Sequence, residues 1–548
     1  MEIKKNEKFV VTIEDMSEDG AGIGKLDGYI WFVKDAMIGD VIEASAMKMK
    51  KNYGFARLVR VIEPAPGRVE ARCPVARACG GCQMQEYSYR EQLKFKEKKV
   101  YNHLKRIGGL GDFDMEPIIG MENPWRYRNK AQFPIGTGKD GRPVAGFYAG
   151  RTHSLIPVPE LDCLLGCEEN RELLKIVLEF MEEYGISAYD EAEHRGLVRH
   201  VLLRKGFASG ELMVCLVING NRLPHGEILT ERLKAAGAAS ISLSVNREKT
   251  NVIMGTEIIN LYGPGYITDK IGDIEYRISP LSFYQVNPVQ TERLYGTALE
   301  FAGLTGGETV WDLYCGIGTI SSFLAKKAGK VYGVEIIPEA IEDARENARR
   351  NGIENVEFFV GKAEEVLPEQ YEKNHVHADV IVVDPPRKGC DPVCLDTILK
   401  MSPEKVVYVS CDSSTLARDV KYLTENGYAV KRVRPVDMFP MSGHVETVVL
   451  LSKGEIDSKN IRVEFSLEDM DMSEFQDGAT YPQIKEYVLE HTGLKVSSLY
   501  ISQVKRKCGL EVGKNYNLPK SEDARQAPTC PPEKENAIRE ALQYFGMI

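Results

Sequence analysis

The segment ETVWDLYCGIGTI, residues 308–320, decides the fold of this chain. An apolar, β-branched run leads into a turn that holds Gly316 and Gly318, and the residues after the turn suit a helix. The same strand–helix alternation continues in KVYGVEII (330–337), PEAIEDARENARRNG (338–352), ADVIVVDPPRKG (378–389) and KVVYVSCD (405–412). Apolar strands that alternate with helices predict a doubly wound, Rossmann-like α/β domain over residues 276–453.

Two more strands close this domain. YAVKRVRPVDMF (428–439) and HVETVVLLSK (444–453) predict a β-hairpin at the edge of the sheet, with Glu446 at the start of an edge strand. A charged residue on an exposed edge strand has an ordinary structural explanation, because charges protect free edges from pairing. The position of Glu446 alone therefore does not indicate a catalytic role, and a second observation is required.

The whole chain, at 548 residues, is too long for one hydrophobic core and predicts a multidomain protein. Short strands with glycine turns in residues 1–66 predict a small, OB-like β-barrel. Residues 67–275 predict an α+β central domain. Residues 454–548 predict a small α-rich extension, in which YPQIKEYVLEHTG (481–493) and SSLYISQVKRKCG (497–509) suit two short helices of helix-turn-helix-like character.

Composition favours a cytoplasmic protein away from membranes. The chain is 43% hydrophobic and 27% charged, and it holds no apolar run of membrane-spanning length. Its start, MEIKKNEKF, lacks the apolar segment of a signal peptide. Twelve cysteines in such a chain predict a metal or cluster site rather than a disulfide scaffold.

Basic residues gather locally although the net charge is −10. In the predicted barrel, cations surround Tyr53 and Phe55, a pattern that suits single-stranded nucleic acid and also an ordinary solvated barrel face. These cations are Lys48, Lys50, Lys51, Arg57 and Arg60. The stretch RYRNKAQF (126–133) adds Arg126, Arg128 and Lys130 on a strand expected to face RNA.

A cofactor site is predicted at the carboxyl ends of the α/β strands. Gly316 and Gly318 allow close approach of a ligand, and Glu335 ends the second strand, where a carboxylate accepts ribose hydroxyls. No third glycine stands at pyrophosphate spacing, so S-adenosylmethionine is favoured over a dinucleotide. Asp384 ends the fourth strand, and Arg387 after the DPP turn argues against methylation of an amino group.

Cys411 ends the next strand, in VVYVSCDSSTLARDV (406–420), and is expected beside Asp384. A buried structural cysteine is the alternative interpretation. Carbon-5 of uracil, however, is a weak nucleophile until a thiolate adds to carbon-6, and a base must later remove the carbon-5 proton. Either Glu446 or His444 could be that base on chemical grounds.

Five motifs of the chain resemble those of the bacterial RNA uracil-5-methyltransferases, which make 5-methyluridine: DLYCGIGT (312–319), SFYQVN (282–287), DPPRKG (384–389), SCDSSTLARD (410–419) and MFPMSGHVET (438–447). The resemblance covers about residues 10–451 and implies a TRAM barrel at the N-terminus. It implies that Cys411 is the nucleophile and Glu446 the proton acceptor. It also implies that the pocket for S-adenosylmethionine and the target base is lined by Gln285, Tyr314, Glu335 and Asp384. Thr319 stands where many relatives carry asparagine.

Four cysteines suggest a metal centre. Cys73, Cys79 and Cys82 form a C-x5-C-x2-C pattern, and a fourth ligand could come from Cys163 or Cys167. Spacing alone allows zinc or an iron–sulfur cluster. The family resemblance implies a [4Fe–4S] cluster with Cys163 as fourth ligand. We expect its role to be structural, because methyl transfer is not a redox reaction.

The favoured function is carbon-5 methylation of a uridine in 23S ribosomal RNA by a monomeric enzyme. The barrel and the cysteines favour ribosomal RNA over transfer RNA, which stays the nearest alternative. An RNA cytosine-5-methyltransferase also uses a thiolate but is not expected to carry HVET. A non-catalytic iron–sulfur RNA-binding protein would not need Cys411 and Glu446.

Overall fold

The computed structural model describes residues 3–150, 152–454, 481–508, 510, 530–545 and 547. The chain forms two compact units, Met1–Ile456 and Asp457–Ile548. Within the described ranges, no helix is both long and apolar enough to cross a membrane.

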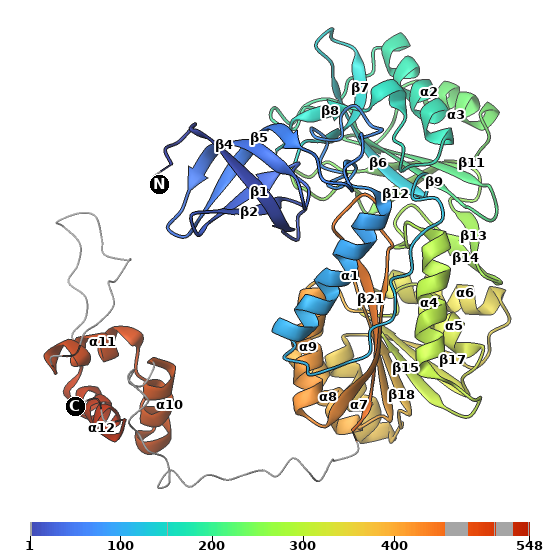
Figure 1. The fold of residues 1–548 in the computed structure, drawn as a ribbon. Coiled ribbons are helices and arrows are strands. Elements are labelled where there is room, and N and C mark those ends of the chain that lie inside the picture. The colour runs from blue at the N-terminus through green and yellow to red at the C-terminus, as the bar shows by residue number, and fades with distance from the viewer. Residues whose placement is uncertain are drawn as a thin grey trace. The chain divides into compact units, whose positions relative to one another are not determined.

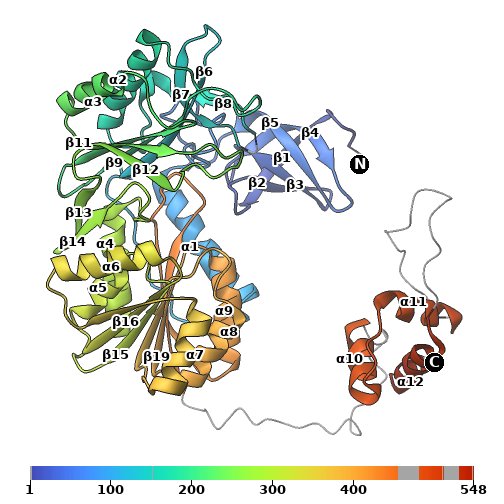
Figure 2. The ribbon, with the colours of Figure 1, turned by 180° about the vertical axis from the view of Figure 1, so that it is seen from behind.

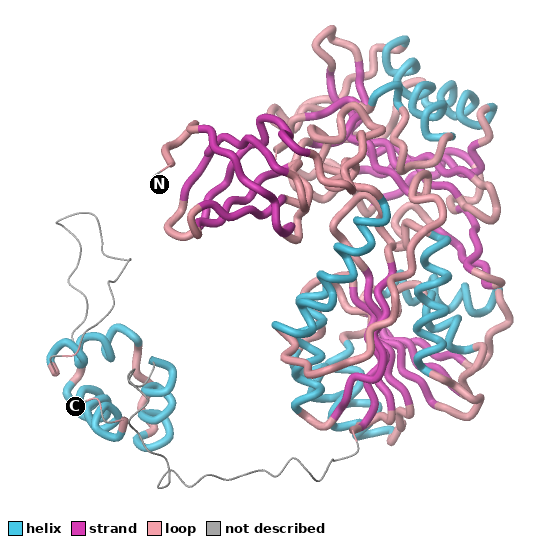
Figure 3. Tube along the Cα trace, in the orientation of Figure 1, coloured by secondary structure: helices cyan, strands magenta, loops and turns pink. Residues whose placement is uncertain are grey.

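The N-terminal barrel is closed, as the sequence predicts, with strand order β1-β2-β3-β5-β4. Its strands form the magenta group next to the N-terminus in Figure 3. Its strands are β1 (Lys8–Met16), β2 (Gly22–Leu26), β3 (Tyr29–Lys34), β4 (Val41–Met49) and β5 (Tyr53–Glu63). Trp31 fills the core and lies so close to Gly54 that a Cβ there would meet the indole at 2.5 Å. Tyr53 and Phe55 are each 38% exposed, and their rings pack with Phe32 on the outer surface.

A second sheet of seven strands forms the centre of the first unit, in the order β12-β11-β10-β9-β6-β7-β8. These strands are β6 (Lys130–Thr137), β7 (Pro143–Tyr148), β8 (Leu155–Pro157), β9 (Val198–Lys205), β10 (Leu212–Ile218), β11 (Ala238–Val245) and β12 (Glu257–Tyr262). Helices α2 (Glu169–Glu183) and α3 (Gly226–Ala235) pack on one face, around Leu174, Val201 and Leu229. A short 3-10 helix (Pro159–Leu161) precedes α2, and a hairpin of β13 (Ile267–Ile271) and β14 (Ile274–Ile278) leads to the next sheet.

The predicted α/β sheet has the order β17-β16-β15-β18-β19-β21-β20. Its strands are β15 (Thr309–Leu313), β16 (Lys330–Glu335), β17 (Val356–Val360), β18 (Val380–Val383), β19 (Lys405–Ser410), β20 (Tyr428–Val436) and β21 (Glu446–Lys453). Its helices are α4 (Pro288–Ala302), α5 (Thr319–Ala325), α6 (Pro338–Arg350), α7 (Ala363–Asn374), α8 (Pro392–Met401) and α9 (Ser413–Glu425). β15 to β19 pair in parallel, so their carboxyl ends meet at one rim.

Helices cover both faces of the α/β sheet (Figures 1 and 2). α4, α5 and α6 lie on one face, and α7, α8 and α9 lie on the other. Helix α1 (Tyr89–Arg106) joins the second group, although it precedes the central sheet in sequence. Its Val100 and Leu104 are fully buried in the same hydrophobic core as Leu416 of α9. α1 thus connects the segment that contains Cys73, Cys79 and Cys82 to the α/β sheet.

The predicted position of the last strand is wrong. β21, which begins at Glu446, is not at the edge but lies between β19 and β20, antiparallel to both. The physical reason is the apolar run TVVLL, which is buried along most of its length and needs a neighbour on each side. β20 takes the edge instead, where its exposed Lys431 is solvated.

The second unit contains helices where the sequence predicts them, and one more. α10 (Tyr481–Thr492) and α11 (Ser498–Lys507) match the two predicted segments, and α12 (Pro532–Tyr544) is additional. The three helices share a core of their own that includes Ile484, Ile501 and Ile538.

We expect a chain shortened to residues 1–456 to keep the melting temperature of the first unit, because the removed residues have a separate core. Calorimetry of the full and shortened chains measures this. A matched chain of residues 1–445 lacks β21 and should not fold, since β19 and β20 would lose their common partner. A large fall in melting temperature for residues 1–456 would contradict the expectation.

Candidate active site

Cys411 and Glu446 lie opposite each other at the rim of the α/β sheet. Cys411 directly follows β19, and Glu446 is the first residue of β21. The last pair of the ladder between these strands joins Ser410 to Thr447, so the next step places Cys411 across from Glu446. Residues directly opposite in an antiparallel pair have side chains close together on one face. The sequence stretches that carry the two residues are therefore brought into contact by strand pairing alone.

Asp384 and Tyr314 extend the same rim. β18 pairs with both β19 and β15, and it ends one residue before Asp384. The backbone N–H of Asp384 donates to the carbonyl of Leu313 at 3.3 Å, next to Tyr314. Electrostatic interactions join the Cys411 thiol to Glu446 and Asp384. Three of the predicted site residues therefore form one cluster.

The glycine turn after β15 has the conformation that its sequence predicts. Gly316 and Gly318 both have positive φ, 56° and 76°, and a Cβ on Gly318 would come within 2.9 Å of the Phe358 ring. Glu335 ends β16 beside this turn and accepts from the N–H of Gly316 at 3.2 Å. A carboxylate held against a glycine turn at the carboxyl ends of parallel strands suits the adenosine part of S-adenosylmethionine.

Gln285 lies in the segment between β14 and α4. Its backbone carbonyl accepts from the side chain of Asn129 at 2.9 Å. Two residues later, Asn287 caps α4 and donates from Nδ2 to the carbonyl of Met438 at 3.0 Å. The SFYQVN stretch is thus tied to the loop that precedes Glu446, which places Gln285 in the neighbourhood of the rim.

The acids at the rim hold their protons unusually strongly. Loss of solvation raises the pKa of Asp384 to about 7, and burial followed by repulsion from Asp384 raises the pKa of Glu446 well above its usual range. Burial and the neighbouring carboxyl of Glu446 raise the pKa of the Cys411 thiol to about 12. The guanidinium of Arg387 acts in the opposite direction and lowers the pKa of both Cys411 and Glu446.

The second candidate base is less well placed. His444 is exposed on its loop, whereas Glu446 is only 3% exposed. Burial, then Arg387, Lys99 and Lys96, lower the pKa of His444. The geometry therefore favours Glu446 as the group that faces Cys411.

The sequence analysis did not predict a role in the site for two charged residues at the rim. It used the first, Arg387, only as an argument against methylation of an amino group. Asp312, fully buried in β15, accepts from the Ser321 hydroxyl at 2.5 Å, and burial raises its pKa to about 7. A charged residue inside the apolar run VWDL was the available signal for Asp312.

Four of the cysteines come together at a second place in the first unit. Cys73, Cys79, Cys82 and Cys163 all line one cavity of about 270 Å³. Cys167 does not line it, and its thiol instead donates to the carbonyl of Arg128 at 3.2 Å. Burial raises the pKa of Cys82 to about 12. Among the described residues, no three metal-binding side chains stand close enough together for a single metal ion.

Two of the cations expected to face RNA, Arg128 and Lys130, line the cysteine cavity, and Arg126 contacts residues of its wall. Arg126 forms an ion pair with Asp162 at 2.5 Å and donates to the carbonyl of Cys163 at 3.1 Å. Lys130 lines the cavity wall, and burial lowers its pKa to about 8. The RNA-facing role of Arg126 stays a prediction, and its guanidinium pairs with Asp162 in this structure.

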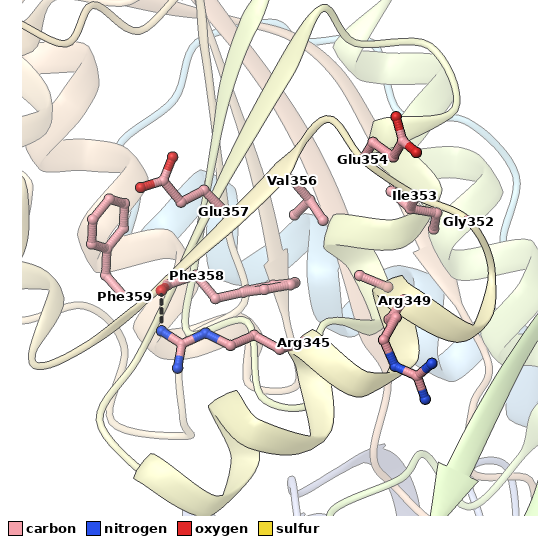
Figure 4. Close-up of a pocket in the computed structure, with 10 residues that line it drawn as sticks. Arg345, Arg349, Gly352, Ile353, Glu354, Val356, Glu357, Phe358 and Phe359 are labelled. Atoms are coloured by element: carbon pink, nitrogen blue, oxygen red, sulfur yellow. Dashed lines mark hydrogen bonds between the residues drawn. The ribbon is translucent and has the colours of Figure 1, made fainter.

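A larger cavity, of about 620 Å³, lies at the outer edge of the α/β sheet between α6 and β17 (Figure 4). Arg345 donates from Nη2 to the carbonyl of Phe358 at 2.7 Å and so covers part of the edge strand. None of the predicted site residues lines this cavity. The position of Arg345 is explained by the protection of a free strand edge.

Comparisons with known proteins agree with the geometry. The family described as tRNA (Uracil-5-)-methyltransferase matches residues 209–454, and the TRAM domain matches residues 4–59. An uncharacterized RNA methyltransferase of Halalkalibacterium halodurans is 53% identical over 451 residues, which are 82% of this chain and 98% of that protein. The chain belongs to the tRNA (uracil-5-)-methyltransferase family. It is an S-adenosylmethionine-dependent RNA methyltransferase with an N-terminal TRAM domain.

Further relatives extend the likeness. An uncharacterized RNA methyltransferase of Bacillus cereus is 50% identical and covers 83% of this chain and 98% of its own length. The solved structure of Pyrococcus abyssi tRNA (uracil-54, C5)-methyltransferase in complex with S-adenosyl-L-homocysteine is 30% identical. It covers 81% of this chain and 100% of that chain, with a TM-score of 0.66.

We expect alkylation of Cys411 by iodoacetamide to speed up about tenfold per pH unit between pH 7 and 9, because its thiol pKa of about 12 lies above that range. Arg387→Met should slow alkylation at each pH by roughly three- to tenfold, since loss of the cation raises the thiol pKa further. Peptide mass spectrometry measures labelling of Cys411, with Cys411→Ser as the blank.

Lys388→Met is the matched control, because it removes the same charge one position further on and Lys388 is exposed. It should leave the labelling rate of Cys411 close to that of the unaltered protein. Equal slowing by both substitutions would contradict the assignment of Arg387.

Proposed function

We propose that this enzyme methylates carbon-5 of a uridine in 23S ribosomal RNA through a covalent bond between Cys411 and carbon-6, acting as a cytoplasmic monomer. The observation that carries the proposal is the register of β19 and β21, which sets Cys411 opposite Glu446 beside Asp384. A thiol and a carboxyl on either side of one base are the two groups that this reaction needs.

The reaction begins when the Cys411 thiolate adds to carbon-6 of the uracil. The carbon-5–carbon-6 double bond opens, and its electron pair moves toward the carbonyl oxygen on carbon-4 to form an enolate. Carbon-5 of the enolate then takes the methyl group from S-adenosylmethionine, and the sulfur–methyl bond breaks to leave S-adenosylhomocysteine. The Glu446 carboxylate next removes the carbon-5 proton, the double bond reforms, and the carbon–sulfur bond breaks to release the thiolate.

The electrostatics of the site suit these roles. A carboxylate whose pKa is raised is a stronger base, which helps Glu446 to take a carbon-bound proton. Arg387 faces both groups and stabilises the thiolate and the carboxylate when they form. Glu335 and the turn of Gly316 and Gly318 would hold the ribose of the methyl donor.

Ribosomal RNA is favoured by the combination of the barrel with the cysteine site. The target uridine must leave its base stack to enter the crevice, and the exposed rings of Tyr53 and Phe55 offer a stacking surface for nearby bases. Transfer RNA is the second candidate, because the similar Pyrococcus abyssi enzyme acts on uracil-54 of tRNA. A cytosine target is not expected with the HVET motif of residues 444–447.

We expect cells that lack the protein to lose 5-methyluridine from one mapped position of 23S ribosomal RNA. The gene for the unaltered chain should restore it, and the gene for Cys411→Ser should not, because serine is a far weaker nucleophile. Mass spectrometry of digests from separated ribosomal and transfer RNA measures the outcome. Loss of 5-methyluridine from transfer RNA alone would show that transfer RNA, and not ribosomal RNA, is the substrate. Full restoration by Cys411→Ser would refute the thiolate mechanism.

We further propose that Cys73, Cys79, Cys82 and Cys163 hold a [4Fe–4S] cluster. The four thiols line one cavity, and Cys163 lies close enough to interact electrostatically with Cys73, Cys79 and Cys82. Ligands of a four-iron cluster bind four separate irons and so stand farther apart than the ligands of one zinc ion. The cluster would link the segment after the barrel to the central sheet and need not transfer electrons.

Separate substitutions of Cys163 and Cys167 should distinguish the proposed cluster ligand from a nearby cysteine that does not bind the cluster. We expect Cys163→Ser to lower bound iron and the visible absorbance of anaerobically purified protein, because it removes a cluster ligand. Cys167→Ser should leave both unchanged, since that thiol bonds to the carbonyl of Arg128 and does not line the cavity. Iron and sulfide analysis measures the result, and equal loss in both variants would contradict the ligand set.

A further inference from the structure

A fully buried ion pair joins two distant parts of the chain. Lys96 of α1 and Asp437, the first residue after β20, are both 0% exposed, with Nζ 2.6 Å from Oδ1. Lys96 also donates to the carbonyl of Phe439 at 3.0 Å, and the Tyr89 hydroxyl donates to the other carboxylate oxygen of Asp437 at 2.9 Å. Buried ion pairs rarely add net stability over apolar side chains, so this pair calls for another explanation.

The pair holds the loop of residues 437–445, which leads directly to Glu446. β20 and β21 pair up to Val436 and Glu446, so the loop closes a hairpin that is longer than a tight turn. Its Met441 has a φ of 66°, an uncommon conformation for a residue other than glycine. A loop of this kind keeps one shape only when its surroundings impose it.

α1 and the segment before it impose that shape along the whole loop. The backbone N–H groups of Gln83 and Met84 donate to the carbonyl of Met441 at 2.9 and 3.1 Å. Gln92 accepts from the N–H of Met441 at 2.9 Å, and Lys99 donates to the carbonyl of Gly443 at 3.2 Å. The ion pair anchors the first residue of the loop, and these bonds follow its path toward Glu446.

We propose that the Lys96–Asp437 ion pair is a positioning device that fixes the end of the β20–β21 ladder, and with it the carboxyl group of Glu446. The inference rests on the proposed function, in which Glu446 removes the carbon-5 proton. Glu446 is the terminal residue of its strand, so fraying of this end moves the base away from the substrate. Displacement by about 1 Å is enough to slow a catalysed step strongly.

A defect in this device has a distinctive chemical consequence. Attack by Cys411 and methylation of carbon-5 come before Glu446 acts, so a misplaced Glu446 leaves the methylated base bonded to the enzyme. Lys96→Met should therefore accumulate a covalent enzyme–RNA adduct. The probe is a short RNA carrying the mapped uridine, with a radioactive methyl donor, separated on a denaturing gel.

Three further variants make the test decisive. Glu446→Gln must trap the adduct if the proposed function is right. Lys96→Arg keeps the charge and should release product faster than Lys96→Met. Tyr89→Phe removes one hydrogen bond to Asp437 and should show a smaller accumulation in a folded protein.

Lys94→Met is the matched control on the same helix, because Lys94 is exposed and pairs only with the nearby Glu91. We expect at least a tenfold larger share of adduct for Lys96→Met than for Lys94→Met. If Glu446→Gln traps adduct while Lys96→Met and Tyr89→Phe lose activity without adduct, the pair is merely structural and the inference is overturned. If Glu446→Gln traps none, the proposed function itself fails.

Discussion

Antiparallel pairing between β19 and β21 is the interaction on which the rest of the active site depends. It attaches β21 to β19, the last of the parallel strands, and the edge strand β20 is attached in turn through β21. Because side chains alternate along a strand, a slip of one residue would turn Glu446 to the opposite face from Cys411. The buried valines and leucines of β21 fix the register, since the same slip would reverse their burial.

Met441, in the loop before Glu446, packs in a small core next to the cysteine site. The side chain of Met441 packs with Tyr127 and Leu165, and Cys82 and Cys163 lie against the same small core. The carbonyl of Met441 is held by the backbone that directly follows Cys82. A cluster in that cavity would therefore stiffen the loop before Glu446 as well as the link to the barrel. Such a cluster would therefore have a structural role in an enzyme whose reaction transfers no electrons.

The sequence predicts the strands and helices of the α/β sheet, the closed barrel and the two helical segments of the extension, because each depends on local periodicity. It misplaces β21, since the position of a strand within a sheet depends on pairing rather than on its own pattern. It overlooks Lys96, because a lysine on a basic helix resembles a solvated one until its partner Asp437 is known. The ion pair of Arg126 is hidden from the sequence for the same reason, as its partner Asp162 lies 36 positions further along the chain.

The acids of the rim explain how a poorly ionised thiol can serve as a nucleophile. Asp312 and Asp384, with pKa values of about 7, and Glu446, whose pKa is higher than usual, lie near one another at the rim of the sheet. Asp384 repels the carboxylates of Asp312 and Glu446, and Asp384 and Glu446 disfavour a thiolate at Cys411. A cation bound among these groups would lower the pKa of each of them, and the sulfonium of a methyl donor is such a cation. The rim is thus suited to a positively charged ligand, whose binding would make the thiol easier to ionise.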